Sequence, residues 1–335
     1  MSNYAISRQE RIYLLTESTF GTIPAVGNTN ACRHISSGLT AVVNNYPRPD
    51  KTGTRSQVIG VLGRKSATWS LSQSLAGSGA PGTVPDCNPI LVALFGGQPV
   101  TSAGVSNTYT LSDPSPIPSL SMYSFRTPST ITQRVILGGV VAEATFQLGQ
   151  NISTWSASGT GIWCLDTANF GTADATQKGG LGSFPVEPGA PVTNGQPTVG
   201  FTGVATFDGN VIAEIQTATL RIRTGSAVAL DTFGSYYPVL AEGEVRTVGL
   251  AFSIYDSDGT GLQDLKQKAV TQTPITVTLQ MGTIAGSIWT WTLNNVQVAQ
   301  PSYDDSKNRY MVVFPESMAH ATSITVRDEL SLVIS

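Results

Sequence analysis

The residue types that could carry hydrolytic or transfer chemistry are few in this sequence. Its two histidines, His34 and His320, are far apart in the chain, and neither belongs to a recognisable nucleophile motif. Gly77-Ser-Gly lacks the G-x-S-x-G pattern of a hydrolase elbow. Such chemistry usually needs a histidine, a matched carboxylate pair or a metal. We therefore expect no enzyme activity, and an enzyme would require His34 or His320 to lie in a cleft beside a carboxylate.

One run resembles a metal site, namely Asp256-Ser-Asp-Gly-Thr-Gly261 followed by Asp264. Its oxygens could hold calcium, but position twelve of an EF-hand loop would fall on Gln267 instead of a glutamate. Aspartate and glycine at a junction between a strand and a helix also form the turn and favour the helix N-terminus. The second interpretation is favoured, so we expect neither a metal nor a cofactor.

The cysteines and tryptophans also have structural interpretations. Three cysteines without short spacing predict buried free thiols instead of a disulfide framework or zinc site; they are Cys32, Cys87 and Cys164. The tryptophans could form a sugar-binding platform; they are Trp69, Trp155, Trp163, Trp289 and Trp291. Most of them occupy alternating positions of expected strands, which favours core packing. Trp289 and Trp291 share one face, which makes them candidates for a core wall or a subunit contact.

The composition argues against a protein that grips nucleic acid. Only 12% of the 335 residues are charged, against roughly 25% in an average soluble domain, and the net charge is −3. Tight phosphate binding needs clustered lysine and arginine. The sequence from Met1 to Arg8 lacks a basic start followed by an apolar core, and no long apolar stretch occurs. We therefore expect a protein that is made and used without crossing a membrane.

A faint internal repeat organises the chain. When Leu39 is aligned with Leu220, an offset of 181 residues (220 minus 39), the strand patterns of the two halves coincide without a gap through about residue 72. Trp69 and its neighbours alternate with serine and threonine, as Leu250 and its neighbours alternate with small or polar residues. A basic residue precedes each of these strands, Lys65 in one half and Arg246 in the other. The repeat predicts two related β units.

The expected organisation follows from this repeat and from turn signals. Residues 1–30 form an N-terminal arm with a possible short helix around Gln9 to Leu15, 31–169 form the first β domain, 170–197 form a Gly- and Pro-rich linker, and 198–335 form the second β domain. Short helices are expected from Asn88 to Gly96 and from about Leu262 to Val270. Each domain is then a β-sandwich or partly open barrel with one short helix.

The sequence resembles the tail tube proteins of long-tailed bacteriophages. The resemblance rests on the arm Leu15-Thr-Glu-Ser-Thr-Phe-Gly-Thr-Ile-Pro24, on the order of strand, long loop, basic residue and strand from Leu39 to Leu71, on the short helix, and on the ending in which Asn308 to Phe314 leads to Arg327-Asp-Glu-Leu. It covers most of the chain. The two units resemble the duplicated members of the family, which build a ring from three chains instead of six.

The resemblance implies a structural protein of the virion tail, assembled in the host cytoplasm. Sheets of successive units would join edge to edge in a ring, with a trimeric pseudo-hexameric ring favoured and a hexamer possible, and the rings would stack. The implied partners are other copies and the tape-measure, distal-tail and tail-terminator proteins. DNA would pass through the channel without specific binding, because a polar or mildly acidic lumen does not hold a polyanion.

The same resemblance assigns candidate surfaces. The arm and the long loops at 44–56 and 224–238 would contact the next ring, and the inter-ring contact candidates are Glu17, Phe20, Asn44, Asn45, Tyr46, Arg48, Asp50, Phe233, Tyr236 and Tyr237. The candidates for the channel lumen are Glu143, Asp304 and Asp305.

A second hypothesis remains open from the sequence. The chain could be a β-sandwich carbohydrate-binding or adhesion protein of a virion or cell surface. A concave patch of exposed tryptophan and aspartate would support that function.

Overall fold

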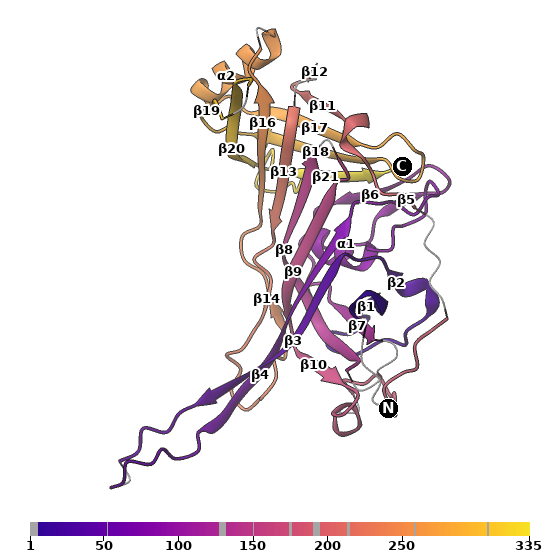
Figure 1. The fold of residues 1–335 in the computed structure, drawn as a ribbon, viewed down its shortest axis with the longest axis vertical. Coiled ribbons are helices and arrows are strands. Elements are labelled where there is room, and N and C mark those ends of the chain that lie inside the picture. The colour runs from indigo at the N-terminus through magenta and orange to yellow at the C-terminus, as the bar shows by residue number, and fades with distance from the viewer. Residues whose placement is uncertain are drawn as a thin grey trace.

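The computed structural model describes residues 6–51, 53–126, 132–149, 151–173, 176–189, 195–212, 215–257, 259–306 and 308–335. Its central feature is an antiparallel sheet that runs through both halves of the chain (Figure 1). In this continuous sheet the strands lie in the order β3 (Ser36–Tyr46), β4 (Val61–Ser74), β9 (Thr154–Gly161), β8 (Arg134–Gly149), β13 (Ile215–Arg223), β16 (Thr247–Tyr255), β20 (Met311–Ala319) and β19 (Ser302–Asp304).

The long strand β8 connects the parts of the fold. Its C-terminal part pairs with β9 and with β13, and so joins the N-terminal half of the chain to the C-terminal half. Its N-terminal part pairs with β7 (Leu120–Arg126) and β10 (Trp163–Asp166). Beyond β7 the sheet continues to β1 (Glu10–Thr16) and β2 (Ala31–Cys32).

A second sheet also draws strands from both halves. Its order is β12 (Asn210–Val211), β11 (Val204–Phe207), β17 (Ile275–Met281), β18 (Trp289–Val296), β21 (Leu330–Ile334), β6 (Ser106–Thr110) and β5 (Val100–Ser102). Two short strands, β14 (Ala227–Val228) and β15 (Ala241–Glu242), pair with each other. The fold is mainly β with sheets packed face to face, which confirms the predicted mainly β, sandwich-like fold class.

Helices are short and have recognisable ends. Helix α1 (Asn88–Phe95) begins with proline inside its first turn and ends at Gly96, whose φ of 84° lies in the left-handed region that favours glycine. Helix α2 (Thr260–Thr271) follows β16. Both helices were expected. Short 3-10 helices lie at Ser7–Gln9, Asn28–Asn30, Phe170–Thr172 and Gly200–Thr202.

The helix predicted around Gln9 to Leu15 is wrong, because Glu10–Thr16 forms strand β1. Ile12 and Leu14 are buried in the larger hydrophobic core, whereas Tyr13 and Leu15 are buried in a smaller one. A strand that is covered on both faces carries no alternation of apolar and polar residues, so periodicity could not identify it.

One hydrophobic core extends across both halves. Phe146 of β8 stacks on Trp155 of β9 with 5.4 Å between ring centroids, and it also contacts Trp291 of the second sheet at 5.6 Å. Phe207 of β11 lies 4.9 Å from Phe252 of β16 in the same way. The larger core includes buried residues from Ile12 to Ile334. Aromatic contacts therefore hold the two sheets face to face, and the contact of Phe146 with Trp291 also joins the two halves of the chain.

The strand pairs at the offset of 181 have the same register. Leu39 pairs with Trp69 in β3–β4, and Leu220 pairs with Leu250 in β13–β16. At the ends of the matching segments, Ser36 pairs with Ser72 as Thr217 pairs with Ser253. Corresponding residues of the two halves thus occupy corresponding places in two strand pairs.

Truncating Phe146 to alanine is expected to lower the free energy of unfolding by about 3–5 kcal/mol, because the ring fills the shared core. Since that core is continuous, denaturation by urea should remain one cooperative transition that shifts as a whole. Phe233→Ala is the matched control: this ring is 101% exposed, so its loss should change stability by less than about 0.5 kcal/mol. Two separate transitions, with only one of them shifted by Phe146→Ala, would contradict a shared core.

Candidate functional site

The continuous sheet has one apolar face and one face rich in hydroxyl groups. Leu39, Phe146 and Leu220 point into the core, so alternate residues on the same strands point to the other side. We call that side the hydroxyl face; it includes Thr40, Thr68, Ser70, Ser72, Thr145, Ser156, Ser158, Thr217, Thr219 and Ser253. A shallow depression in it is lined by side chains of β3, β4, β8 and β9. The hydroxyl face therefore crosses the boundary between the two halves.

The charges on the hydroxyl face are paired. Glu143 lies 3.3 Å from Nε of Arg221 and 3.4 Å from Nε of Arg223. Arg223 also bonds Glu316 through Nη1 at 3.1 Å. All four side chains are partly exposed, so these ion pairs add little to stability. Two carboxylates and two guanidinium groups cancel one another, which leaves this part of the face without net charge.

The predicted lumen candidates lie in two places. Glu143 belongs to the charge cluster just described, and its partners Arg221, Arg223 and Glu316 were not predicted. Apolar and polar residues alternate from Thr217 to Arg223, and this alternation places Arg221 and Arg223 on the same side of their strand. Asp304 ends β19, where its carboxylate accepts a hydrogen bond from the backbone N–H of Ser306, and Asp305 is exposed just beyond it.

The continuous sheet ends in two open edges. Among the described residues, β3 pairs only with β4, and β19 pairs only with β20. Such an edge presents unpaired backbone N–H and C=O groups, which are a template for another strand. Within the chain, β13 is the counterpart of β3 at the offset of 181, and it has a partner on both sides.

The predicted loop contacts are mostly exposed. Asn44, Asn45 and Tyr46 end β3, and beyond them Arg48 forms an ion pair with Asp50 at 2.5 Å. The hairpin that carries them projects away from the body of the molecule (Figure 1). In the other long loop, Phe233 and Tyr236 are exposed, whereas the ring of Tyr237 packs against Trp163 at 5.8 Å between centroids.

The two candidates from the arm are engaged inside the chain. The buried Glu17 carboxylate accepts hydrogen bonds from the backbone N–H groups of Gly21 and Gly138, each at 2.8 Å. It also accepts bonds from the hydroxyls of Ser119 and Ser121 at 2.6 and 2.5 Å. Burial raises the pKa of Glu17, although these four donors oppose the shift. Phe20 packs against the smaller core.

His34 does lie beside a carboxylate, with its Nε2 atom 3.7 Å from Oε2 of Glu10. Glu10 also accepts hydrogen bonds from the hydroxyls of Ser37 at 2.9 Å and Ser124 at 2.5 Å, and from Nε of Arg126 at 3.1 Å. These three partners lie on β3 and β7, whereas Glu10 itself lies on β1. The cluster therefore ties these strands together. His320 is exposed in a turn.

The other candidate chemistry is also accounted for by packing. Cys32, Cys87 and Cys164 are buried free thiols. Asp256 accepts a bond from Lys266 at 2.9 Å and Asp264 pairs with Lys268 at 2.9 Å, while Asp258 lies outside the described residues. Among the described residues, no three histidine, cysteine, aspartate or glutamate side chains gather as metal ligands would.

The tryptophans line the core instead of a surface. Trp69, Trp155, Trp289 and Trp291 are all at most 3% exposed. Trp163 is partly buried, and its ring faces Tyr237 and the Nζ atom of Lys65 at 5.3 Å. An exposed aromatic platform for sugar is therefore not built from these five residues. No helix in the described part of the chain is long and apolar enough to span a bilayer.

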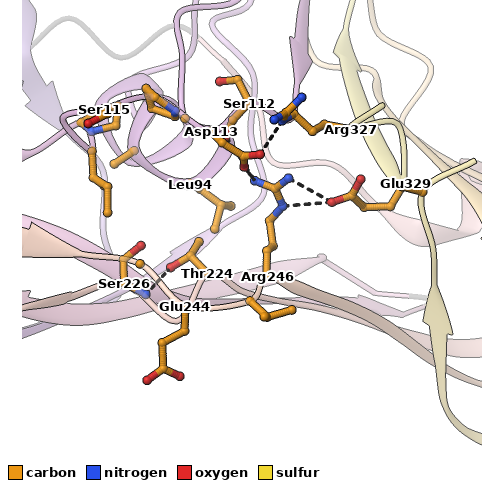
Figure 2. Close-up of a pocket in the computed structure, with 18 of the residues that line it drawn as sticks. Leu94, Ser112, Asp113, Ser115, Thr224, Ser226, Glu244, Arg246, Arg327 and Glu329 are labelled. Carbon is orange, nitrogen blue, oxygen red and sulfur yellow. Dashed lines mark hydrogen bonds and ion pairs between the residues drawn. The ribbon is translucent and has the colours of Figure 1, made fainter. Parts of the chain in front are cut away.

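A pocket at the junction of the halves is organised by Arg246 (Figure 2). The guanidinium donates to Glu329 at 3.0 Å, lies 3.3 Å from Asp113, and donates to the carbonyl oxygen of Ser112 at 3.2 Å. Arg327 donates to the same Asp113. Because Asp113 and Ser112 belong to the N-terminal half, Arg246 links that half to Glu329 in the loop that precedes β21.

The Glu10 cluster predicts a pH dependence of stability. Burial alone would raise the pKa of Glu10, but hydrogen bonds from His34, Ser124 and Ser37 and the charge of Arg126 hold it at about 2, below its usual value of 4.5. A pKa depressed by folding contributes stability above pH 4.5, which is lost as the pH falls toward 2. The stability difference between wild type and Glu10→Gln, measured by urea unfolding, should therefore be largest above pH 4.5 and shrink on acidification. A difference that is independent of pH would contradict this assignment.

Comparison with known proteins identifies the family to which the chain belongs. A family model described as phage tail tube protein matches residues 7–312. No curated protein matches the sequence. The matched region covers most of the chain and includes both edge strands, β3 and β19. The chain therefore belongs to the phage tail tube protein family.

Proposed function

We propose that this protein is the structural subunit of a phage tail tube and that its copies close into a ring through the two open edges of the continuous sheet. The observation that supports this most is the pairing of β8 with β13, which already joins the two halves edge to edge. In the proposal, residues 31–169 and 198–335 are two related units that share a core, joined by residues 170–197. The same kind of edge pairing then joins the second unit of one copy to the first unit of the next.

The edge strand β19 corresponds in position to part of β8. Phe146 of β8 pairs with Trp155, which faces Gln73 of β4. Tyr303 of β19 pairs with Val312, which faces Ile254 of β16. Gln73 and Ile254 are separated by the offset of 181, so Tyr303 occupies in the second unit the place of Phe146 in the first.

This correspondence defines a register for ring closure. Phe146 pairs with Leu220, and Thr145 pairs with Arg221. The corresponding residues are Tyr303 and Ser302 on β19, and Leu39 and Thr40 on β3. In the proposed ring, Tyr303 of one copy lies opposite Leu39 of the next copy, and Ser302 lies opposite Thr40.

The hydroxyl face of the continuous sheet is proposed to line the channel for DNA. Its serine and threonine side chains offer no cationic groups, and its arginines Arg221 and Arg223 are matched by Glu143 and Glu316. A surface that binds duplex DNA tightly does so by neutralising phosphates with lysine or arginine. A hydroxyl-rich wall whose arginines are matched by carboxylates lets the polyanion move, and we place Glu143 and Asp304 on this wall.

Rings are proposed to stack into a tube, three chains to each ring because each chain supplies two units. Tape-measure, distal-tail and tail-terminator proteins are the proposed partners, and host cytoplasm is the proposed place of assembly. Contacts between neighbouring copies fall to the exposed members of the predicted set; they are Asn44, Asn45, Tyr46, Arg48, Asp50, Phe233 and Tyr236. Glu17, Phe20 and Tyr237 instead position these segments from within the chain.

Ring closure can be tested with the cysteine pair Thr40→Cys and Ser302→Cys in one chain. Both positions are exposed in the single chain, and directly opposed residues of an antiparallel pair are close enough for a disulfide. Mild oxidation of assembled protein should join copies covalently, and the largest product on a denaturing gel should contain one ring of chains. Negative-stain microscopy of the same sample should show stacked annuli.

The matched control is Gln147→Cys with Thr219→Cys, which lie opposite each other in β8 and β13. This pair should cross-link within one chain, whether or not the protein assembles. If the control pair forms its disulfide while the Thr40/Ser302 pair never joins two copies in annuli, the proposed edges do not close the ring.

The channel assignment predicts the effect of removing both carboxylates. In the double variant Glu143→Gln, Glu316→Gln, Arg221 and Arg223 lose their carboxylate partners and face the channel as free cations. Assembled tubes should then retain short duplex DNA at low ionic strength and release it as salt rises, with log K falling by about 0.9 per phosphate neutralised for each decade of salt. Gln147→Ala on the same face is the control and should retain no more DNA than wild type. Equal retention by the double variant and wild type would remove these residues from the channel wall.

A further inference from the structure

The chain contains the same hairpin twice, in two different conformations. At the offset of 181, Tyr46 and Val61 correspond to Ala227 and Glu242, and both couples are paired in the same register. In the first half the ladder continues from β3–β4 into the hairpin, which projects freely (Figure 1). In the second half the ladder breaks after Arg223 and resumes as β14–β15.

The second hairpin is bent onto the first half of the same chain. Thr224 donates its backbone N–H to the carbonyl oxygen of Ala142 at 3.0 Å, and Val228 donates its own to the hydroxyl of Thr160 at 3.0 Å. Farther along, the backbone N–H of Lys65 donates to the carbonyl oxygen of Tyr236 at 2.8 Å. The loop therefore crosses β8, β9 and β4 in turn.

The bend has a counterpart in the straight hairpin. The ladder of the second half is interrupted between Arg223 and Ala227, and Gly225 in this interval has a φ of +62°. The corresponding residue of the first half is Asn44, and β3 has a bulge between Val43 and Asn45. Asparagine is among the residues that best tolerate a left-handed backbone after glycine. The straight hairpin therefore has a bending point at the same place.

We propose that the first hairpin, with arms 44–51 and 53–63, bends at Asn44 and docks on the second unit of the neighbouring copy in the same ring. Its docking geometry repeats the contact that the second hairpin makes on the first unit within the chain. This inference rests on the proposed ring. Within one chain, the second unit lies beside the first unit, and ring closure would place the first unit of each copy beside the second unit of its neighbour in the same way.

The receiving surface follows from the same correspondence. In the first half, Thr160 pairs with Thr68. The residue that corresponds to Thr68 at the offset of 181 is Gly249, and Gly249 pairs with Met318. Met318 therefore takes the place of Thr160 in the second half. Val228 corresponds to Pro47. Val228 donates its backbone N–H to the hydroxyl of Thr160, whereas Pro47 has no N–H and Met318 has no hydroxyl. Because donor and acceptor are replaced together, the corresponding contact leaves no buried polar atom unsatisfied.

Exposed apolar residues on both sides fit this contact. On the hairpin they are Tyr46, Ile59, Val61 and Leu62. Beside the receiving strand, Ile324 is 103% exposed and Val326 is also exposed, and both line the wall of the pocket that contains Arg246. Burying such side chains against each other is favourable.

The two segments also carry opposite formal charges. The hairpin arms have three basic side chains and one acidic one before Gly60; they are Arg48, Lys51, Arg55 and Asp50. The segment from Glu316 to Glu329 has three acidic side chains and one basic one; they are Glu316, Asp328, Glu329 and Arg327. Glu316 and Glu329 are already paired with Arg223 and Arg246 within the chain. The charges favour this partner over a second hairpin because two basic hairpins would repel each other.

The test is the cysteine pair Pro47→Cys and Met318→Cys in one chain, oxidised after assembly. Docking within a ring predicts covalent products that stop at the same number of chains as the Thr40/Ser302 pair, because the contact closes around the axis. An open ladder of larger products would mean that the hairpin contacts another ring, and it would overturn the inference. The native thiols should not interfere, since burial raises the pKa of Cys32 and Cys87 and raises that of Cys164 to about 11.

Val228→Cys with Thr160→Cys is the control, because it should cross-link within one chain at the docked hairpin. If the Thr40/Ser302 pair joins copies but the Pro47/Met318 pair does not, the docking inference is wrong and the proposed ring stands. If neither pair joins copies in annuli, the ring itself fails and the inference falls with it.

A second set of variants tests the bend. Asn44→Val should slow Pro47/Met318 cross-linking by roughly 5- to 30-fold, since a β-branched residue resists a left-handed backbone, whereas Asn44→Gly should preserve the rate. Thr40/Ser302 cross-linking should stay unchanged in both, which separates loss of bending from loss of folding. Equal cross-linking rates in the valine and glycine variants would show that the hairpin does not bend at Asn44.

Discussion

The pairing of β8 with β13 is the interaction on which the rest of this structure depends. It fuses the strands of two halves into one sheet and aligns their hydroxyl-rich sides on one surface. It also leaves β3 and β19 at opposite ends, each with a single partner strand among the residues that the structure describes. The core beneath this junction is continuous, with Phe146 in contact with tryptophans of both sheets. The two halves are therefore one mechanical body, and the open edges are held at a fixed distance and angle from each other.

Part of this arrangement was predictable from local sequence. Helix α1 was predicted because Pro89 and Gly96 mark its ends, and the strands around Trp69 and Leu250 were predicted from strict alternation. Strand β1 was not, because Tyr13 and Leu15 are buried on one side while Ile12 and Leu14 are buried on the other. Periodicity reports exposure, and a strand without an exposed face gives no such signal.

The candidate surfaces were less predictable than the elements that carry them. Glu143 could be named as an acidic residue, but its two arginine partners come from a strand more than seventy residues away, and only the pairing of β8 with β13 brings them together. Glu17 looked like a contact residue of an exposed arm, yet four donors from separate segments surround it. Strand order, which decides the edges, depends on contacts between distant residues that no local pattern encodes.

If copies join through these edges as proposed, the brevity of β19 affects how assembly begins. Its three residues offer only a few backbone hydrogen bonds, and the facing edge strand is disturbed by a bulge, so both ends are poor templates for indiscriminate pairing. Two isolated molecules that meet in solution would separate again before a third arrived, because the contact between them is small. In such a system spontaneous polymerisation has a lag, and a preformed platform that presents several edges at once sets both the time and the place at which elongation starts.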